Sequence, residues 1–456
     1  MDIVIPDLSL VVLIGPSGAG KSTFARRHFK PTEVLSSDFF RGLVCDDEAE
    51  QSVNRDAFES LHFILGKRLA NRRFTVVDAT NVQAAARQTL LGLARKYHFL
   101  STAIVFDVPE EVCQAHNQQR PGRTVLPTVV RLHRQQLEQS FAALKRERFH
   151  HVHFLSTRDE IADVRIVRRP MSFDRRGERG PFDVIGDVHG CFDELAALLT
   201  LLGWEIKARA DTSGRTAYLA RPPAGRKLLF VGDLVDRGPK SPEVLRLVMD
   251  MVEAGSALCV AGNHDDKLAR HLHGNAVKIS HGLAETLAQL ELEGPEFTAR
   301  VRRFLDVLPS HLLLDGGKLV LAHAGLRADL QGRASKRVEA FALYGETTGL
   351  MDEFGLPVRG DWFADYRGSA SVLFGHTPVS EVEWINKTLN LDSGCVFGGR
   401  LTALRYPEGE LLSVPAARVY CVPPRPFRSP QPRMLLPDRC GPAMKDVGQG
   451  EAPSPK

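Results

Sequence analysis

The chain has 456 residues, long enough for two or three domains that each bury a hydrophobic core. With 43% hydrophobic and 25% charged residues its composition excludes a disordered or fibrous chain, and a net charge of +4 argues neither for nor against a nucleic-acid partner. There is no apolar run of membrane-spanning length, no secretory pattern at the N-terminus and no paired spacing among the seven cysteines. These features predict a cytoplasmic protein with reduced thiols and no membrane partner, and they leave the oligomeric state open.

The first predicted strand, residues 9–14, leads into a glycine-rich phosphate-binding pattern at residues 15–22. In a G-x-x-x-x-G-K-S loop the backbone N–H groups point at the phosphates, the lysine adds positive charge and the serine hydroxyl can hold Mg²⁺. The helix that follows directs its positive N-terminus at the same phosphates. We therefore predict an ATP and Mg²⁺ site in which Ser22 binds the metal, Lys21 takes part in catalysis, and the nucleotide is held by Gly15, Gly18, Gly20, Lys21, Ser22 and Thr23.

Helical stretches then alternate with predicted strands, which indicates a parallel sheet covered on both faces. Asp38 follows the second strand and is placed either to take a proton from an attacking hydroxyl or to cap the next helix. Asp78 ends the third strand and either contacts Mg²⁺ through water or closes a turn. Arg120 and Arg123 flank a Pro-Gly pair and are typical of a lid that stabilises phosphate charge, although a solvated turn has the same composition. These later strands are expected at residues 34–35, 74–77, 103–107 and 152–155.

An arginine-rich stretch at residues 168–180 has no apolar period, and we predict a linker there, either solvated or in contact with nucleic acid. It separates a first domain at residues 1–167 from a second at residues 181–414. The tail, residues 415–456, is rich in proline and lacks an apolar period, so it is predicted to be mostly disordered.

The second domain carries five polar turns, most of which follow an apolar run. Together they offer carboxylate, amide and imidazole ligands, a mixture that suits Mn²⁺, iron or Zn²⁺ better than Mg²⁺ alone. One Asp-x-His by itself is more often an ordinary polar turn, but five metal-competent turns in one domain predict a metal centre. The turns are Asp187-Val188-His189, Gly232 to Gly238, Gly262 to Asp265, Ala322 to Gly325, and Gly375-His376-Thr377.

This set of motifs resembles the binuclear metallophosphoesterase superfamily and, within it, the protein-phosphatase-like branch. The resemblance implies a calcineurin-like α/β sandwich that uses two Mn²⁺ or similar divalent ions to clamp a phosphate and activate water. The implied metal ligands are Asp187 and His189 for the first ion, Asp233 as the bridge, and Asn263, His323 and His376 for the second.

Other residues of the same turns receive roles by the same resemblance. Arg237 is expected to bind the phosphate oxygens and to assist catalysis, and His264 to act as general acid for the leaving oxygen. Asp236 is expected to orient a histidine. Asp392, in a turn near the metals, is predicted to steer the substrate.

The first domain resembles the 5′-OH polynucleotide kinases in Asp38 with Arg41, in the turn that begins at Asp78, and in the arginine lid. The resemblance implies that Asp38 is the general base and that Arg41 contacts the nucleic-acid acceptor. It also implies that Arg120 and Arg123 bind phosphate and that Arg123 assists catalysis. The family's further lid arginine aligns with His116, which puts that one contact in doubt.

Both domains together resemble the bacterial polynucleotide kinase-phosphatases of RNA repair, over residues from about 9 to 405. The resemblance implies ATP-dependent phosphorylation of 5′-OH ends and removal of a 3′-phosphate, 2′-phosphate or 2′,3′-cyclic phosphate. The expected partner is RNA ends. The C-terminal ligase-type domain of that family is not found, so either the chain works with a separate ligase or the sequence is a fragment.

Three other interpretations stay open. The chain could join a small-molecule kinase to a nucleotide or dinucleoside-polyphosphate phosphatase, or a protein phosphatase to an ATP-sensing domain, or it could be a binding protein without activity. The segment Asp361 to Tyr366 is either a wall on which a nucleobase stacks or a satellite hydrophobic cluster.

Overall fold

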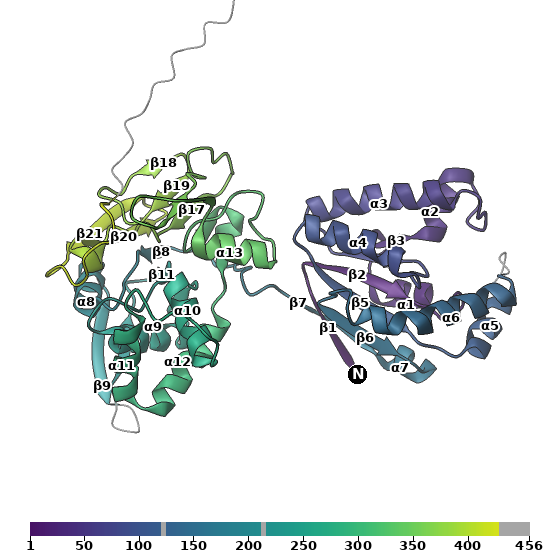
Figure 1. Ribbon diagram of the computed structural model, residues 1–456, viewed down its shortest axis with the longest axis horizontal. Helices are drawn as coiled ribbons and strands as arrows, with labels where there is room; N and C mark the ends of the chain where they lie inside the picture. The colour runs from purple at the N-terminus through teal and green to yellow at the C-terminus, as the bar shows by residue number, and fades with distance from the viewer. Residues whose placement is uncertain (120–124, 211–215, 428–456) are drawn as a thin grey trace, which may run out of the picture.

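The computed structural model describes residues 1–119, 125–210 and 216–427, which form two α/β domains side by side (Figure 1). The predicted fold class is confirmed for both halves: a parallel-sheet domain with a phosphate loop comes first, and a two-sheet sandwich follows. In the described ranges no helix has the length and apolarity needed to cross a membrane.

The first domain is built on one sheet of five parallel strands in the order β3-β4-β2-β5-β6. The central strand β2 is buried on both faces because its residues alternate between two cores: Leu10 and Val12 belong to one, Val11 and Leu13 to the other. This explains why it reads as a continuous apolar run. The strands are β2 (Ser9–Ile14), β3 (Val34–Ser36), β4 (Thr75–Asp78), β5 (Leu100–Phe106) and β6 (His151–Leu155).

Helices cover both faces of this sheet, as the alternating pattern predicts (Figure 1). Three of them, α3, α4 and α6, contribute leucines to the core on one face, while α1 packs against the other. The helices are α1 (Lys21–His28), α2 (Ser37–Cys45), α3 (Asn54–Ala70), α4 (Ala84–Lys96), α5 (Glu110–Gln118), α6 (Pro127–Leu144) and α7 (Arg158–Asp163).

A second, two-stranded parallel sheet pairs β1 (Asp2–Pro6) with β7 (Arg165–Arg169). The predicted boundary at residue 167 is therefore too early, because β7 continues through Arg169. The predicted linker is also not solvated throughout. Phe173 is buried and stacks on His311 with 4.5 Å between ring centroids, and it accepts a hydrogen bond from the backbone N–H of Leu313.

The second domain is a sandwich of two five-stranded sheets, ordered β12-β11-β8-β20-β21 and β13-β14-β17-β19-β18. Side chains from both sheets, such as Val184 and Leu321, fill the space between them and make the inner core. The strands are β8 (Phe182–Ile185), β11 (Lys227–Phe230), β12 (Ala257–Cys259), β20 (Arg400–Tyr406) and β21 (Glu410–Pro415), and β13 (His311–Leu314), β14 (Leu319–Ala322), β17 (Ser371–Phe374), β18 (Trp384–Ile385) and β19 (Thr388–Asn390).

Helices cover the outer face of the first sheet, and two hairpins extend from the sandwich. The hairpins are β9 (Glu205–Ala210) with β10 (Thr216–Arg221), and β15 (Thr347–Met351) with β16 (Pro357–Arg359). The helices are α8 (Phe192–Leu201), α9 (Ser241–Glu253), α10 (Asn263–Leu272), α11 (Leu283–Glu293), α12 (Pro295–Val307) and α13 (Lys336–Tyr344).

The beginning of the proline-rich tail, which was predicted to be mostly disordered, is ordered. Residues 416–427 run back over the second domain, held by hydrogen bonds such as those from the Tyr420 and Cys421 N–H groups to the Val396 carbonyl, at 3.1 and 3.0 Å. The sequence did not reveal this ordered segment because these contacts join distant segments and leave no local period. The rest of the tail, residues 428–456, lies outside the described residues.

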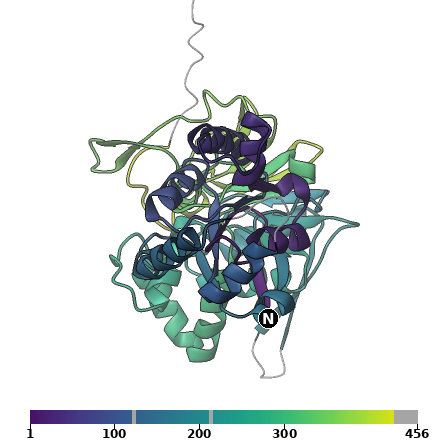
Figure 2. The ribbon, with the colours of Figure 1, turned by 90° about the vertical axis from the view of Figure 1, so that its right-hand side faces the viewer.

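A buried arginine of the second domain makes several of the contacts between the two domains. Arg333 donates to the carbonyls of Leu69 and Tyr97, both at 2.8 Å, and of Ala70 at 2.7 Å. These carbonyls lie at the C-terminal ends of α3 and α4, where a cation is favourable. Figure 2 views the molecule from the side of the first domain, with these helices in front of the sandwich.

Candidate active sites

The phosphate loop lies between β2 and α1 and has the geometry that the sequence predicts. Gly18 and Gly20 have left-handed φ angles of 81° and 91°, and a Cβ atom at Gly18 would overlap the Cys113 carbonyl of α5. The Lys21 ammonium group donates to the carbonyls of Gly15 and Pro16, at 2.8 and 2.7 Å. Ser22 and Thr23 occupy the first turn of α1, as the motif requires.

Asp38 lies in the first turn of α2, just beyond the carboxyl end of β3. The N-cap of α2 is Ser36, so the alternative role of Asp38 as helix cap is not observed. Arg41 is buried and holds Asp38 by an ion pair, while its other nitrogens donate to the Glu48 carbonyl at 2.8 Å and to Asn54 at 3.0 Å. In this structure Arg41 therefore positions Asp38, and its predicted contact with an acceptor stays a prediction.

The lid residues Arg120 and Arg123 lie outside the described residues. His116, which aligns with the family's further lid arginine, contacts the phosphate loop through Nδ1 at 2.9 Å from the Gly18 carbonyl. Asp78 is buried at the end of β4, beside the strand that carries the loop.

A buried ion pair beside the kinase-like site was not singled out from the sequence. Arg87 of α4 pairs with Glu147 through two bonds of 2.7 and 2.6 Å, and both side chains are almost fully buried. Arg87 also donates to the carbonyls of Asn81 and Val82, in the turn after β4. The pair supports the turn that faces the phosphate loop. The pairing of Arg87 with Glu147 could have been found from sequence only by comparing many related sequences.

In the second domain the candidate metal ligands come together where strands of both sheets end. Asp187 and His189 follow β8, Asp233 follows β11, and Asn263 follows β12; His323 and His376 follow β14 and β17 in the other sheet. The carboxyl ends of parallel strands share one edge, so turns far apart in sequence converge. All six predicted ligands contribute to this edge.

Two overlapping groups of ligand atoms form there, and Asp233 belongs to both. One contains His189, Asp233 and His264, the other Asp233, His323 and His376. One carboxylate oxygen of Asp233 lies 3.4 Å from His189 Nε2 and 3.3 Å from His323 Nε2. Asn263 joins the second group, with its Oδ1 2.9 Å from His323 Nε2. The shared carboxylate is what a bridged pair of ions requires.

His189 and His323 are held so that their Nε2 atoms face the centre. His189 donates from Nδ1 to the Val235 carbonyl at 2.8 Å, and His323 from Nδ1 to the Val231 carbonyl at 3.1 Å. Such bonds fix the tautomer and ring orientation of metal-binding histidines.

The buried carboxylates and histidines of the centre shift one another's pKa values, and positive charge stabilises the carboxylates. Burial would raise the pKa of Asp233, but the surrounding histidines, led by His323, hold it well below its usual range. Burial lowers the pKa of His323, yet the carboxylates of Asp233 and Asp187 raise it to about 9. Burial and the Asp392 charge raise the pKa of Asp187.

The donor set fits a pair of divalent ions. Asp187 Oδ1 is buried without a hydrogen-bond partner among the described residues, while Oδ2 accepts the His376 N–H at 3.0 Å. His323 Nε2 lies 3.0 Å from His376 Nδ1, a contact between two ring nitrogens that needs a proton or a cation. Mixed carboxylate, amide and imidazole ligands suit ions such as Mn²⁺.

Arg237 and His264 lie beside the two groups. Arg237 donates to Nε2 of His189 at 2.6 Å and of His264 at 2.9 Å, so its guanidinium group lies at the centre where a phosphate would bind. His264 donates from Nδ1 to Asp236 at 2.6 Å, and Asp236 also accepts the Thr286 hydroxyl at 2.7 Å. Asp236 thus orients His264, and Thr286 is a supporting residue that the sequence did not reveal.

Two further carboxylates are buried nearby. Asp392 accepts the Gly394 N–H at 3.0 Å, and burial raises its pKa to about 6. Its negative charge beside Asp187 favours holding cations over direct phosphate contact, and substrate steering stays a prediction. Asp265, which was assigned no role, accepts from Leu234 N–H at 3.0 Å and Gly262 N–H at 2.9 Å and so ties two metal-binding turns together.

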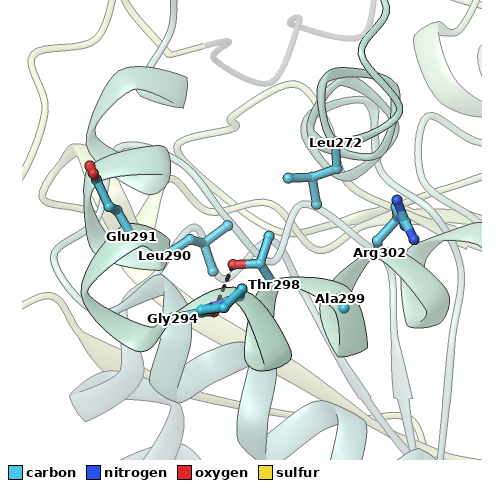
Figure 3. Close-up of a pocket in the computed structure, with 8 residues that line it drawn as sticks. Leu272, Leu290, Glu291, Gly294, Thr298, Ala299 and Arg302 are labelled. Atoms are coloured by element: carbon cyan, nitrogen blue, oxygen red, sulfur yellow. Dashed lines mark hydrogen bonds between the residues drawn. The ribbon is translucent and has the colours of Figure 1, made fainter.

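The centre opens into a cavity of about 230 Å³. The segment from Asp361 to Tyr366 does not reach it: Trp362 and Tyr366 are buried in a hydrophobic core, so the hydrophobic-cluster alternative is the correct one. A separate hollow of about 410 Å³ lies between α10, α11 and α12. Its walls include Leu272, Leu290 and Thr298, and no candidate metal ligand is among the described residues that line it (Figure 3).

Comparisons with known proteins agree with this geometry. The AAA domain model matches residues 10–147, and the calcineurin-like phosphoesterase model matches residues 180–408. The chain therefore belongs to the calcineurin-like phosphoesterase family and carries a kinase-like P-loop domain in front of the phosphoesterase domain.

Individual relatives match about half of this chain, and the curated ones match over nearly all of their own length. The asymmetrical bis(5′-nucleosyl)-tetraphosphatase PrpE of Anoxybacillus flavithermus is 46% identical over 253 residues, 54% of this chain and 99% of the relative. PrpE of Bacillus subtilis is 45% identical over 52% of this chain and 96% of its own. A solved serine/threonine phosphatase of Saccharomyces cerevisiae is 17% identical with a TM-score of 0.37, covering 53% of this chain and 82% of its own.

Proposed function

We propose that the C-terminal domain hydrolyses dinucleoside polyphosphates with the help of two divalent ions, and that the N-terminal domain transfers a phosphoryl group from ATP to a hydroxyl acceptor. The observation that carries the first half is the pair of ligand groups sharing Asp233, with Arg237 beside them at the base of a cavity. The relatives' name supports this substrate class. The name of these relatives favours hydrolysis of dinucleoside polyphosphates over RNA end healing as the main activity.

The residues that would hold the ions are those predicted: Asp187 and His189 on one side, Asp233 between, and Asn263, His323 and His376 on the other. Mn²⁺ is the ion we propose for this donor set. Bound divalent ions would supply Lewis-acid stabilisation of phosphate charge and acidify water.

The chain's own residues supply the remaining chemistry. The two terminal nitrogens of Arg237, which contact the histidines in this structure, can turn toward phosphate oxygens. The guanidinium group can then donate two parallel hydrogen bonds to two oxygens of one phosphate. The oxygen of water forms a bond to phosphorus and releases a proton to solvent, while the bond between phosphorus and the leaving oxygen breaks. The leaving oxygen keeps the electron pair and takes the Nε2 proton of protonated His264, whose ring Asp236 holds in place through Nδ1.

The experiment uses the full-length protein with diadenosine tetraphosphate and Mn²⁺, and separates the products by ion-exchange chromatography. Asymmetrical cleavage yields a nucleoside monophosphate and a triphosphate, whereas symmetrical cleavage yields two diphosphates. We expect asymmetrical cleavage. The Asp233→Ala variant should lose this activity, and the Lys21→Ala variant should keep it. Hydrolysis of p-nitrophenyl phosphate without cleavage of the tetraphosphate would contradict the proposal.

A second candidate, RNA end healing, rests on the kinase-like domain. Asp38, fixed by the buried Arg41 at the same sheet edge as the phosphate loop, is suited to activate a hydroxyl acceptor. We therefore propose RNA 5′-OH ends as the acceptor to test first, with a separate ligase as partner. An RNA with a 5′-OH and a 2′,3′-cyclic phosphate, incubated with ATP, Mg²⁺ and Mn²⁺, should gain a 5′-phosphate in a way that Lys21→Ala abolishes. An unchanged 5′ end would remove this candidate.

A further inference from the structure

The ordered part of the tail, residues 416–427, forms what we call the C-terminal strap. Its start is anchored by Glu194 of α8, whose Oε1 accepts the Ala417 N–H at 2.9 Å and the Tyr420 hydroxyl at 2.8 Å. Its end is anchored by Phe427, whose ring lies 6.2 Å from that of Phe397, edge on. The anchors at both ends make the strap part of the folded domain.

The strap forms one wall of the cavity above the candidate metal centre. Pro423 to Phe427 line the cavity from one side, and the β15–β16 hairpin lines it from another through Leu356, Pro357 and Arg359. Arg425 of the strap joins the two walls by an ion pair with Asp352 in the hairpin turn, at 3.1 Å. Both side chains remain partly exposed, at 25% and 21%.

The chemistry of these walls suits phosphate and an aromatic base. Arg359 and Arg425 add two guanidinium groups to Arg237, all lining one cavity. Arg237 lies 5.1 Å over the Phe397 ring, and Phe397 contacts Phe427, so aromatic rings extend from the metal centre to the strap. The phosphate that reacts would engage the metal centre and Arg237, and the cations of the walls are placed for other phosphates of the same substrate.

The lining of the cavity offers both charged and aromatic groups. The cavity has a volume of about 230 Å³, and residues of the strap and of the β15–β16 hairpin line it together with Arg237 and the candidate metal ligands. An aromatic ring at the rim offers a face to any nucleobase.

We propose that the strap is a substrate subsite of the phosphatase domain. Arg425 binds a phosphate that is not attacked, and the Phe427 ring contacts a base of the same nucleotide. This inference rests on the proposed hydrolysis of dinucleoside polyphosphates and adds a part of the chain that recognises them. The subsite does not contribute to the binding of a short monoester, because such a substrate reaches the metal centre without touching the strap.

The test compares full-length variants on diadenosine tetraphosphate and on p-nitrophenyl phosphate. Arg425→Ala should raise KM for the tetraphosphate about tenfold, the loss of one charge-assisted hydrogen bond, with kcat/KM for p-nitrophenyl phosphate within twofold of wild type. Phe427→Ala should act in the same direction. Arg418→Ala is the matched control, because Arg418 is a strap arginine that lies over the Tyr420 ring and does not line the cavity.

A second variant separates phosphate binding from anchoring. Asp352→Asn breaks the ion pair but leaves the Arg425 charge in place, so it should keep or lower KM for the tetraphosphate. If it raises KM as much as Arg425→Ala does, Arg425 only anchors the strap and the inference is wrong. Unchanged kinetics of Arg425→Ala in an enzyme that cleaves the tetraphosphate would also overturn it, while the proposed function would stand. A wild type that cleaves only p-nitrophenyl phosphate would remove the proposed function itself.

Discussion

Several candidate site residues have backbone angles that are rare for residues with side chains. Their φ values lie between 45° and 74°, in the left-handed region that glycine usually occupies. Such conformations cost about 1–3 kcal/mol each and persist where the surrounding structure requires them, most often at functional sites. The residues are His189, Asp233, Asp236, Arg237 and His376. The fold thus accepts local strain to aim these side chains at one centre.

At this scale Asp236 has a testable role. It accepts from His264 at 2.6 Å and from Thr286 at 2.7 Å, so it acts on the predicted reaction through His264. Asp236→Asn should therefore lower kcat on p-nitrophenyl phosphate by about 10–100-fold, the usual effect of losing such a supporting bond. Thr286→Val, which removes only the support of Asp236, should have a smaller effect.

Metal content, measured by elemental analysis, distinguishes positioning from ligand loss in these variants. Both should bind as much Mn²⁺ as wild type, and KM should change less than kcat. If Asp236→Asn keeps kcat within twofold, Asp236 does not control His264.

At the scale of elements, the kinase-like domain depends on one buried ion pair between α4 and the segment after α6. Arg87 and Glu147 are 0% and 4% exposed, and Arg87 also supports the turn after β4. A buried arginine without its carboxylate is strongly destabilising, although an apolar pair in its place often is not.

Glu147→Gln should therefore destabilise the kinase-like domain by about 3–5 kcal/mol, and the double variant Arg87→Leu with Glu147→Leu should cost less. Thermal unfolding followed by far-ultraviolet circular dichroism measures the loss. The three tryptophans, Trp204, Trp362 and Trp384, all lie in the phosphoesterase domain, so their fluorescence should report an unchanged transition.

An exposed pair on α3 provides the control. Arg55 and Glu59 are 88% and 65% exposed, so Glu59→Gln should change stability by about 0.5 kcal/mol or less. Equal effects of Glu59→Gln and Glu147→Gln would contradict the role assigned to the buried pair.

At the scale of the whole molecule, Arg333 couples the two domains. Its three hydrogen bonds cap α3 and α4 of the kinase-like domain from a loop of the phosphoesterase domain. The nearby contact between His98 Nδ1 and the Ser335 hydroxyl, at 2.9 Å, adds a further link. Removing the guanidinium leaves three carbonyls without their charged donor, at a cost of about 3 kcal/mol.

Arg333→Ala should therefore loosen the domain contact without unfolding either domain. We expect a larger radius of gyration in small-angle X-ray scattering than for wild type, because undocked domains separate. Arg337→Ala, on the exposed side of α13, is the matched control and should leave the radius of gyration unchanged. An unchanged radius in Arg333→Ala would show that other contacts hold the domains.

The sequence by itself determined both fold classes, the phosphate loop and the set of residues that meets at the metal centre. It could do so because each motif is local: an apolar strand, then a turn with a metal-binding or phosphate-binding side chain, as at Asp187 or Lys21. Parallel strands end at one edge, so the order of the motifs already implied that they converge. The substrate class was not determined in this way, because the same ligand set serves nucleotides, RNA ends and proteins.

Only the tertiary structure decided what surrounds these motifs. Arg333 meets Leu69 across 264 positions of the chain, and Arg425 meets Asp352 across 73. Contacts of this kind follow no periodicity, since they depend on how separate elements pack and not on the elements themselves. The strap illustrates the difference: its prolines predicted disorder, and its order comes from anchors on Glu194 and Phe397 that become neighbours only once the sandwich has folded.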